Sequence, residues 1–260
     1  MSADIFPLDP GRRPQESPTG PPLVAVPHAG GTSHAFRSWT TPARSRGFTM
    51  FGTRMATPAA GCPAPTVRER AQGLARSLAE LGEPYVLVGH SLGGLVAAEA
   101  VLQLERDRPH AVPALLVVCA THPPHLRRPA PVPSGTEAEA VDFLRRAGGT
   151  PAEVLADRGM RELAVAMLLD DLASLRGFVW DGPRLTTPTA VYAGRTDPLA
   201  PPESLARWTD AAESVTPRAF DSGHFFPHER TAEVLDAIRL DLPDGEGPGA
   251  VGRPRPAHRP

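Results

Sequence analysis

The feature that most constrains the fold of this chain is a serine set between two glycines, at the junction of an apolar run and a helical stretch. Gly89-His90-Ser91-Leu92-Gly93 follows the apolar residues 85–88 and precedes residues 92–104, which are rich in Ala, Leu and Val. A G-x-S-x-G turn between a strand and a helix holds its serine in strained geometry, so small residues must flank it. The motif predicts an exposed Ser91 hydroxyl at the carboxyl edge of a sheet. The alternative interpretation is a glycine-rich helix start that Ser91 only caps.

Around this turn, stretches typical of strands and of helices alternate along the chain. Strands are expected at residues 23–26, 48–52, 85–89, 113–120, 189–193 and 214–220, and helices at 33–45, 66–81, 92–104, 203–211 and 231–240. In the helix at 66–81, Thr66 with Glu69 three residues later is typical of a capping box. The alternation predicts an α/β fold, a mostly parallel sheet with helices on both faces.

The alternation breaks in the middle of the chain, where helices are expected at residues 137–146 and 152–175 with no strand between them. We interpret residues of about 125–181 as a helical insertion, which often acts as a lid in enzymes. Residues 21–240 then form one α/β domain. The polar, proline-rich residues 1–20 are expected to be a flexible leader, and residues 241–260 a disordered tail.

Composition argues against several classes of function. A formal net charge of -2 and a pI near 6.5 favour neither nucleic acid nor a membrane surface as a partner. The two cysteines, Cys62 and Cys119, lack the spacing of a disulfide framework or a metal site. The sequence shows neither a signal peptide nor an apolar stretch long enough to span a bilayer, so we expect a cytoplasmic protein.

A serine hydroxyl needs a positioned base to act as a nucleophile at neutral pH. His224 is the favoured base, because it lies after the last expected strand and before the last expected helix. Its rival His228 is nearer the helix start, where it is expected to face solvent or cap the helix. Asp197 is the favoured acid because it follows the strand at 189–193, although a turn aspartate before proline is the other interpretation. Asp221 is the fallback acid, but it precedes His224 by only three residues.

Attack on a carbonyl also requires N–H donors for the oxyanion that forms. In a fold with this turn, one donor is the amide after the serine, here that of Leu92, and the other comes from the loop after an early strand. That loop reads Pro27-His28-Ala29-Gly30-Gly31, and the Ala29 amide is the candidate donor. An ordinary Gly-Gly turn is the alternative. His28 is expected to pack or to orient the loop.

Four motifs together resemble the type II thioesterases, stand-alone members of the α/β-hydrolase superfamily that accompany polyketide synthases and non-ribosomal peptide synthetases. The motifs are residues 27–31, Gly89-His90-Ser91-Leu92-Gly93-Gly94, Gly194-Arg195-Thr196-Asp197-Pro198 and Gly223-His224-Phe225-Phe226. The resemblance covers residues of about 21–240 and includes a lid segment at 148–155. Residues 52–61 depart from it, since they lack a Pro-Gly-Arg-Gly loop, and Gly94 stands where Ala is frequent.

This resemblance implies hydrolysis of acyl thioesters held on the phosphopantetheine arm of an acyl or peptidyl carrier protein, for editing or product release. It implies a Ser91, Asp197 and His224 triad, an oxyanion hole of the Ala29 and Leu92 amides, and neither metal nor cofactor. We expect a monomer. Three alternatives stay open: a carboxylesterase or lipase acting on free esters, a thioesterase that releases its product by cyclisation, and a non-catalytic protein that binds carrier proteins.

The insertion supplies apolar side chains that could enclose an acyl chain. Leu144, Leu168 and Leu172 are the candidate substrate-binding residues, with Leu163 and Val165 beside them. Plain packing between helices is the alternative interpretation of this stripe.

Overall fold

A computed structural model describes residues 3–8, 20–55, 63–82, 84–126 and 136–243 of the chain. Its strands are β1 (Asp4–Pro7), β2 (Leu23–Val26), β3 (Met50–Arg54), β4 (Val86–His90), β5 (Leu115–Cys119), β6 (Thr189–Gly194) and β7 (Val215–Phe220). Its α-helices are α1 (Thr40–Arg44), α2 (Val67–Leu78), α3 (Leu92–Asp107), α4 (Glu137–Ala147), α5 (Ala152–Ala156), α6 (Arg158–Ala173), α7 (Pro202–Leu205), α8 (Phe226–Glu229) and α9 (Thr231–Asp241). Short 3₁₀ helices are η1 (Ser33–Trp39), η2 (Pro109–Ala111), η3 (Pro124–Leu126) and η4 (Ala206–Asp210).

The described strands form one sheet in the order β1-β3-β2-β4-β5-β6-β7. Every neighbouring pair is parallel except β1 and β3, which run antiparallel. Strands β2, β4, β5 and β6 are buried along their whole length, as expected of strands covered on both faces. The mostly parallel sheet expected from the alternation is therefore confirmed.

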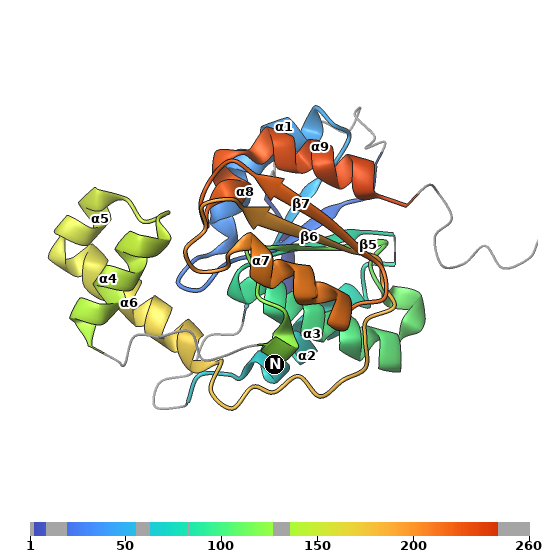
Figure 1. Cartoon of the computed structure of the whole chain (residues 1–260), viewed down its shortest axis with the longest axis horizontal. Helices are drawn as coiled ribbons and strands as arrows, with labels where there is room; N and C mark the ends of the chain where they lie inside the picture. Colours follow the sequence, from blue (N-terminus) through green and yellow to red (C-terminus); the bar gives the residue numbers. More distant parts are fainter. Residues whose placement is uncertain (1–2, 9–19, 56–62, 83, 127–135, 244–260) are drawn as a thin grey trace, which may run out of the picture.

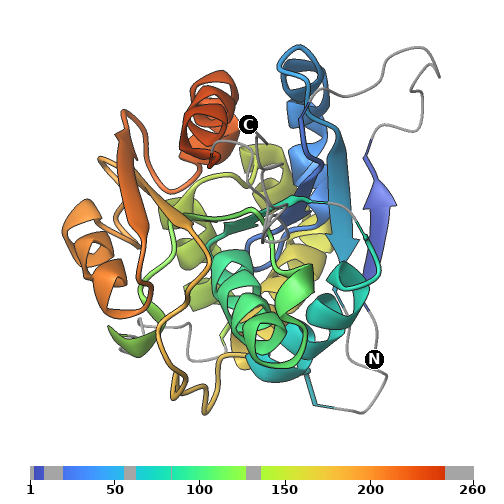
Figure 2. The same cartoon turned by 90° about the vertical axis from the view of Figure 1, so that its right-hand side faces the viewer.

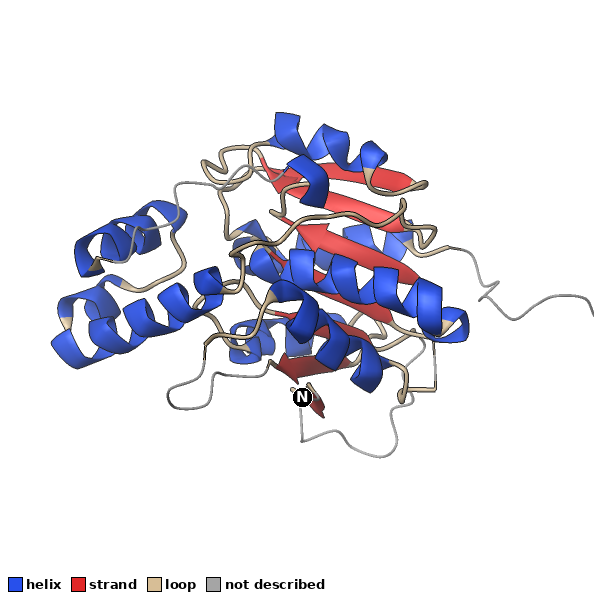
Figure 3. Cartoon of the chain, turned by 90° about the horizontal axis from the view of Figure 1, so that it is seen from below, coloured by secondary structure: helices blue, strands red, loops and turns tan. Residues whose placement is uncertain are grey.

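Helices cover both faces of this sheet (Figures 1 and 3). One face packs against α2, α3 and η4, whose buried side chains include Leu74, Val101 and Trp208. The other packs against η1, α1 and α9, which contribute Phe36, Trp39 and others to a second core. Helix α2 begins with the predicted capping box: the Glu69 amide donates to the Thr66 hydroxyl at 3.3 Å, and the Thr66 amide to the Glu69 carboxylate at 2.7 Å. Within the described residues, no helix is both long and apolar enough to cross a membrane.

The prediction of a flexible leader over residues 1–20 is wrong for Asp4–Pro7. These residues form β1 at one edge of the sheet, opposite β7 at the other edge (Figure 2). An edge strand pairs with one neighbour only, and it tolerates a proline such as Pro7. A short strand of this kind therefore cannot be recognised from its length or its composition. Residues 9–19 of the expected leader and 244–260 of the expected tail lie outside the described residues.

The insertion between β5 and β6 carries α4, α5 and α6, and no described residue between these helices forms a strand. The helices stand beyond the end of the sheet toward which β6 and β7 point (Figures 1 and 3). The single helix expected at 152–175 is broken at Asp157, whose backbone is extended and whose carboxylate accepts from the Met160 amide at 2.8 Å. An N-cap at this position starts α6 as a separate helix.

Candidate active site

Ser91 lies between the last residue of β4 and the first residue of α3, as the motif predicts. Its backbone has φ 54° and ψ -118°, and only Ala120 shares a positive φ among the described residues other than glycine. Such a conformation costs about 1–3 kcal/mol and persists only where the surrounding structure imposes it. Here the Ser91 amide donates to the Cys119 carbonyl oxygen at 2.8 Å, which ties the turn to the end of β5.

The glycines of the motif permit close contacts around this turn. A Cβ atom at Gly89 would lie 2.4 Å from Gly94 Cα, and one at Gly93 would lie 2.4 Å from the carbonyl oxygens of Val26 and Pro27. These neighbours are backbone atoms, so a side chain at either glycine would force the turn apart. Gly93 thereby brings the start of α3 against the loop that follows β2.

Asp197 and His224 form a buried pair, with His224 Nδ1 lying 2.8 Å from Asp197 Oδ2. The Asp197 side chain is 0% exposed, and its Oδ1 accepts from the amides of Leu199 and Ala200. Burial alone would raise the pKa of Asp197, but the hydrogen bond and charge of His224 together with the two amides lower it below its ordinary value. The ionised carboxylate therefore holds the proton on Nδ1, which leaves Nε2 of His224 as a proton acceptor.

The rival residues lie elsewhere. Asp221 is exposed and pairs with Arg195 at 2.8 Å, whereas the carboxylate beside His224 Nδ1 is that of Asp197. The expectation that His228 faces solvent or caps a helix is wrong. Its ring packs edge-on against Phe36 at 5.0 Å and faces His28 at 6.0 Å. The short helix α8, which begins two residues after His224, carries His228 inward.

A cavity of about 140 Å³ is lined by the predicted site residues other than Asp197, which lies behind His224. Ser91, His224, Ala29 and Leu92 line it from the sheet side, and Leu144, Leu168 and Leu172 line it from α4 and α6. Phe225 also lines it. Of the other residues on the predicted stripe, Val165 is buried within the helical insertion, whereas Leu163 is 63% exposed and does not line the cavity.

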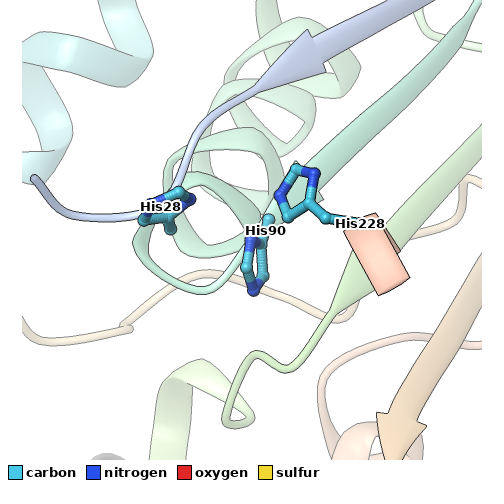
Figure 4. Close-up of side chains that lie close together, drawn as sticks. All are labelled: His28, His90 and His228. Carbon is cyan, nitrogen blue, oxygen red and sulfur yellow. The ribbon is translucent and has the colours of Figure 1, made fainter. Parts of the chain in front are cut away.

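Three histidines from separate segments, one of them in the loop after β2, lie close together (Figure 4). The candidate ligand nitrogens of His28, His90 and His228 lie within 4.8 Å of one another, which makes them the group among the described residues that could hold a metal ion. Burial lowers the pKa of His28 to about 3 and that of His228 to about 4, and it holds that of His90 well below its usual value. Three neutral imidazoles are a ligand set that zinc accepts, so this group does not test the expected absence of a metal, which stays a prediction.

Several residues that surround the site are not among the predicted site residues. The Thr121 hydroxyl lies 3.0 Å from the Ser91 carbonyl oxygen, and a Cβ atom at Gly94 would lie 2.1 Å from that hydroxyl. Gly149, with φ +79°, lies against the Phe225 ring, where a Cβ atom would come within 2.2 Å. Asp171 of α6 accepts from the Gly30 amide at 2.8 Å. The family segment at 148–155 could have drawn attention to Gly149, but no motif points to Thr121 or Asp171.

Comparisons with known proteins identify the family of this chain. The family model described as "Thioesterase domain" matches residues 21–242. A protein named as a probable cadicidin biosynthesis thioesterase of Streptomyces griseus is 28% identical over 88% of this chain and 64% of its own length. Thioesterase TesA of Mycobacterium marinum is 25% identical over 86% of this chain and 92% of its own. The solved structure of YbtT, a type II thioesterase from the yersiniabactin NRPS/PKS pathway, superposes with a TM-score of 0.77 at 25% identity, covering 92% of this chain and 98% of that one.

Proposed function

This chain belongs to the thioesterase family and has the α/β-hydrolase fold, and we propose that it hydrolyses acyl groups from the phosphopantetheine arm of carrier proteins in polyketide or non-ribosomal peptide biosynthesis. The observation that carries the proposal is the buried Asp197–His224 pair, whose His224 lines the same cavity as the strained Ser91. The resemblance to a type II thioesterase supports a stand-alone role in editing or product release.

In the proposed mechanism, Ser91 Oγ attacks the thioester carbonyl carbon while His224 Nε2 takes the hydroxyl proton. Asp197 holds the ring and stabilises the imidazolium that forms. The Ala29 and Leu92 amides donate to the oxyanion. When the tetrahedral intermediate collapses, the carbon–sulfur bond breaks and the departing sulfur of the carrier arm takes the proton from His224 to leave as a thiol. His224 then activates water, which hydrolyses the acyl-enzyme to a carboxylic acid and restores Ser91. No step in this sequence uses a metal or a cofactor.

The apolar wall formed by Leu144, Leu168 and Leu172 supports a substrate with an acyl chain, since these side chains face the cavity that Ser91 lines. The proposed partner is an acyl or peptidyl carrier protein, and the proposed form is a monomer. A carrier-bound substrate places the reaction in the compartment of the synthase, which we propose is the cytoplasm.

The test uses a carrier protein loaded with a short acyl group, followed by intact mass over time beside a Ser91→Ala control. We expect the acyl mass to disappear with the native protein only. If both samples keep the acyl group across several chain lengths, carrier-thioester hydrolysis is wrong. Hydrolysis of free esters with no effect on the carrier would favour a carboxylesterase, and a cyclic product would show a cyclising release.

A further inference from the structure

Asp171, on the helix α6 of the insertion, joins three segments that are far apart in the sequence. Its Oδ2 accepts a hydrogen bond of 2.8 Å from the backbone amide of Gly30, in the loop after β2. Its Oδ1 accepts a hydrogen bond of 2.7 Å from Nη1 of Arg70, on α2. The Asp171 carboxylate therefore holds the loop that carries the candidate oxyanion donor, and it also pairs with the Arg70 guanidinium of α2.

The loop also packs directly onto α6. Gly30 has φ +75°, and a Cβ atom there would lie 3.4 Å from the Cα and Cβ atoms of Leu168, one turn before Asp171. Ala29 packs against the apolar cluster of the insertion that includes Leu168 and Leu172. The conformation of this loop is therefore set by its contact with α6 as well as by the strand before it.

Arg70 is placed to balance the charge of Asp171. Its side chain is 5% exposed, while that of Asp171 is 19% exposed, so little water screens the pair. Arg70 Nε also donates to the Pro65 carbonyl oxygen at 3.3 Å, and the neighbouring Val67 amide donates to the Ser174 carbonyl oxygen at 3.1 Å. These contacts dock the end of α6 on the start of α2.

We propose that Asp171 is a positioning residue for the reaction: by fixing the Ala29–Gly30 peptide through the Gly30 amide, it holds the adjacent His28–Ala29 peptide so that the Ala29 amide faces the oxyanion. The inference rests on the proposed function. Because Asp171 occupies the Gly30 amide, Ala29 is left as the donor from this loop. An unbalanced carboxylate beside the oxyanion loop would oppose the negative charge that develops there, and Arg70 removes that opposition. The same helix lines the cavity through Leu168 and Leu172, so enclosure of the substrate and placement of the donor depend on one docked helix.

The first test compares Asp171→Ala with Asp170→Ala, a matched control that removes an exposed carboxylate from the adjacent position of α6. The readouts are kcat and KM on acyl-carrier protein, and the inhibition constant of a trifluoromethyl ketone analogue of an acyl pantetheine, which forms an oxyanion on Ser91. We expect Asp171→Ala to lower kcat roughly tenfold or more and to raise the inhibition constant of the analogue by a similar factor, with KM little changed. The control should match the native protein. An increase in KM alone, or no change, would overturn the proposal.

A second comparison tests the charge balance with variants that keep a polar side chain at both positions. Arg70→Gln leaves the Asp171 charge unbalanced and should lower kcat, whereas Arg70→Gln combined with Asp171→Asn removes the charge and keeps an acceptor for Gly30. We expect the double variant to recover most of the lost kcat. Lower activity in the double variant than in Arg70→Gln would contradict the charge-balancing role. Ser91→Ala is measured beside them: if it retains activity, the proposed function fails, and if it is inactive while Asp171→Ala and Arg70→Gln are fully active, only this inference fails.

Discussion

His90 Nε2 lies 2.9 Å from the backbone carbonyl oxygen of His224, although the two residues are 134 positions apart. His90 is the residue directly before Ser91, and it is fully buried. Burial lowers its pKa far below the usual value, so the ring is neutral and its Nε2–H can donate to that carbonyl. The turn that carries the candidate nucleophile therefore holds the loop that carries the candidate base.

This contact predicts a loss of stability and activity in His90→Leu. The variant leaves the buried His224 carbonyl without its donor, which costs about 1–3 kcal/mol of unfolding free energy. We also expect kcat to fall, because the His224 loop loses one of its supports. Urea unfolding and steady-state kinetics measure the two effects. His90→Gln, which retains a donor, should recover part of both losses, and equal losses in the two variants would argue against the hydrogen bond as the cause.

The Asp197–His224 pair predicts a large kinetic effect in Asp197→Asn. Without the carboxylate, the proton on Nδ1 is no longer fixed and the imidazolium is no longer stabilised, so kcat should fall by about 10⁴-fold. Asp221→Asn is the matched control, because Asp221 is exposed and pairs with Arg195. Its kcat should stay within a factor of about two, since exposed ion pairs contribute little. Comparable losses in both variants would show that Asp197 is not the acid.

The contact between Gly94 and Thr121 predicts that Gly94→Ala destabilises this chain, although Ala favours helices more than Gly does. The added Cβ would lie 2.1 Å from the Thr121 hydroxyl, and such overpacking costs about 1–3 kcal/mol. Thermal unfolding of the purified variant checks this. Thr121→Ala removes the hydroxyl and leaves only its own Cβ at 3.0 Å from the added Cβ, so the double variant should be more stable than Gly94→Ala alone. Failure of that rescue would show that Thr121 is not the obstacle.

The buried histidines predict a loss of stability on mild acidification. His228 has a pKa lowered to about 4, whereas its ordinary value is 6.5, so the unfolded chain binds a proton more readily than the folded one. Its stabilising contribution is complete above about pH 6.5 and is lost as the pH falls toward 4. His28 and His90 act in the same direction, while the charge of Glu229 opposes the shift at His228.

Urea unfolding of the native protein and His228→Phe at pH 7.5 and pH 5 measures this effect. We expect the native protein to be less stable at pH 5 than at pH 7.5. The difference in unfolding free energy between the two pH values should be smaller in His228→Phe. His110→Phe serves as the control, because His110 is exposed in η2. An unchanged pH dependence in His228→Phe would mean that His228 is protonated as easily in the folded chain as in the unfolded one.

The sequence by itself determined the features that short segments impose. Four apolar residues before Gly89 are enough to indicate a buried strand, and the Thr66 and Glu69 pair is enough to start α2. The order of strands and helices then brings Ser91, Asp197 and His224 to one edge of the sheet, because the carboxyl ends of parallel strands share that edge. Burial and local hydrogen bonding act over only a few residues of the chain. The patterns that they impose can therefore be recognised in the sequence before the fold is known.

Only the tertiary structure decided which atoms meet across long separations. The Gly30 amide meets Asp171 over 141 positions, His90 meets the His224 carbonyl, and Thr121 occupies the space beside Gly94. The edge strand β1 likewise depends on β3 for its only hydrogen-bonding neighbour in the described sheet. From the sequence pattern alone, a polar side chain such as that of Asp171 could equally well face solvent or accept a hydrogen bond from a buried amide. Its partner is set by how α6 docks on α2, and that docking depends on packing between segments that no local pattern encodes.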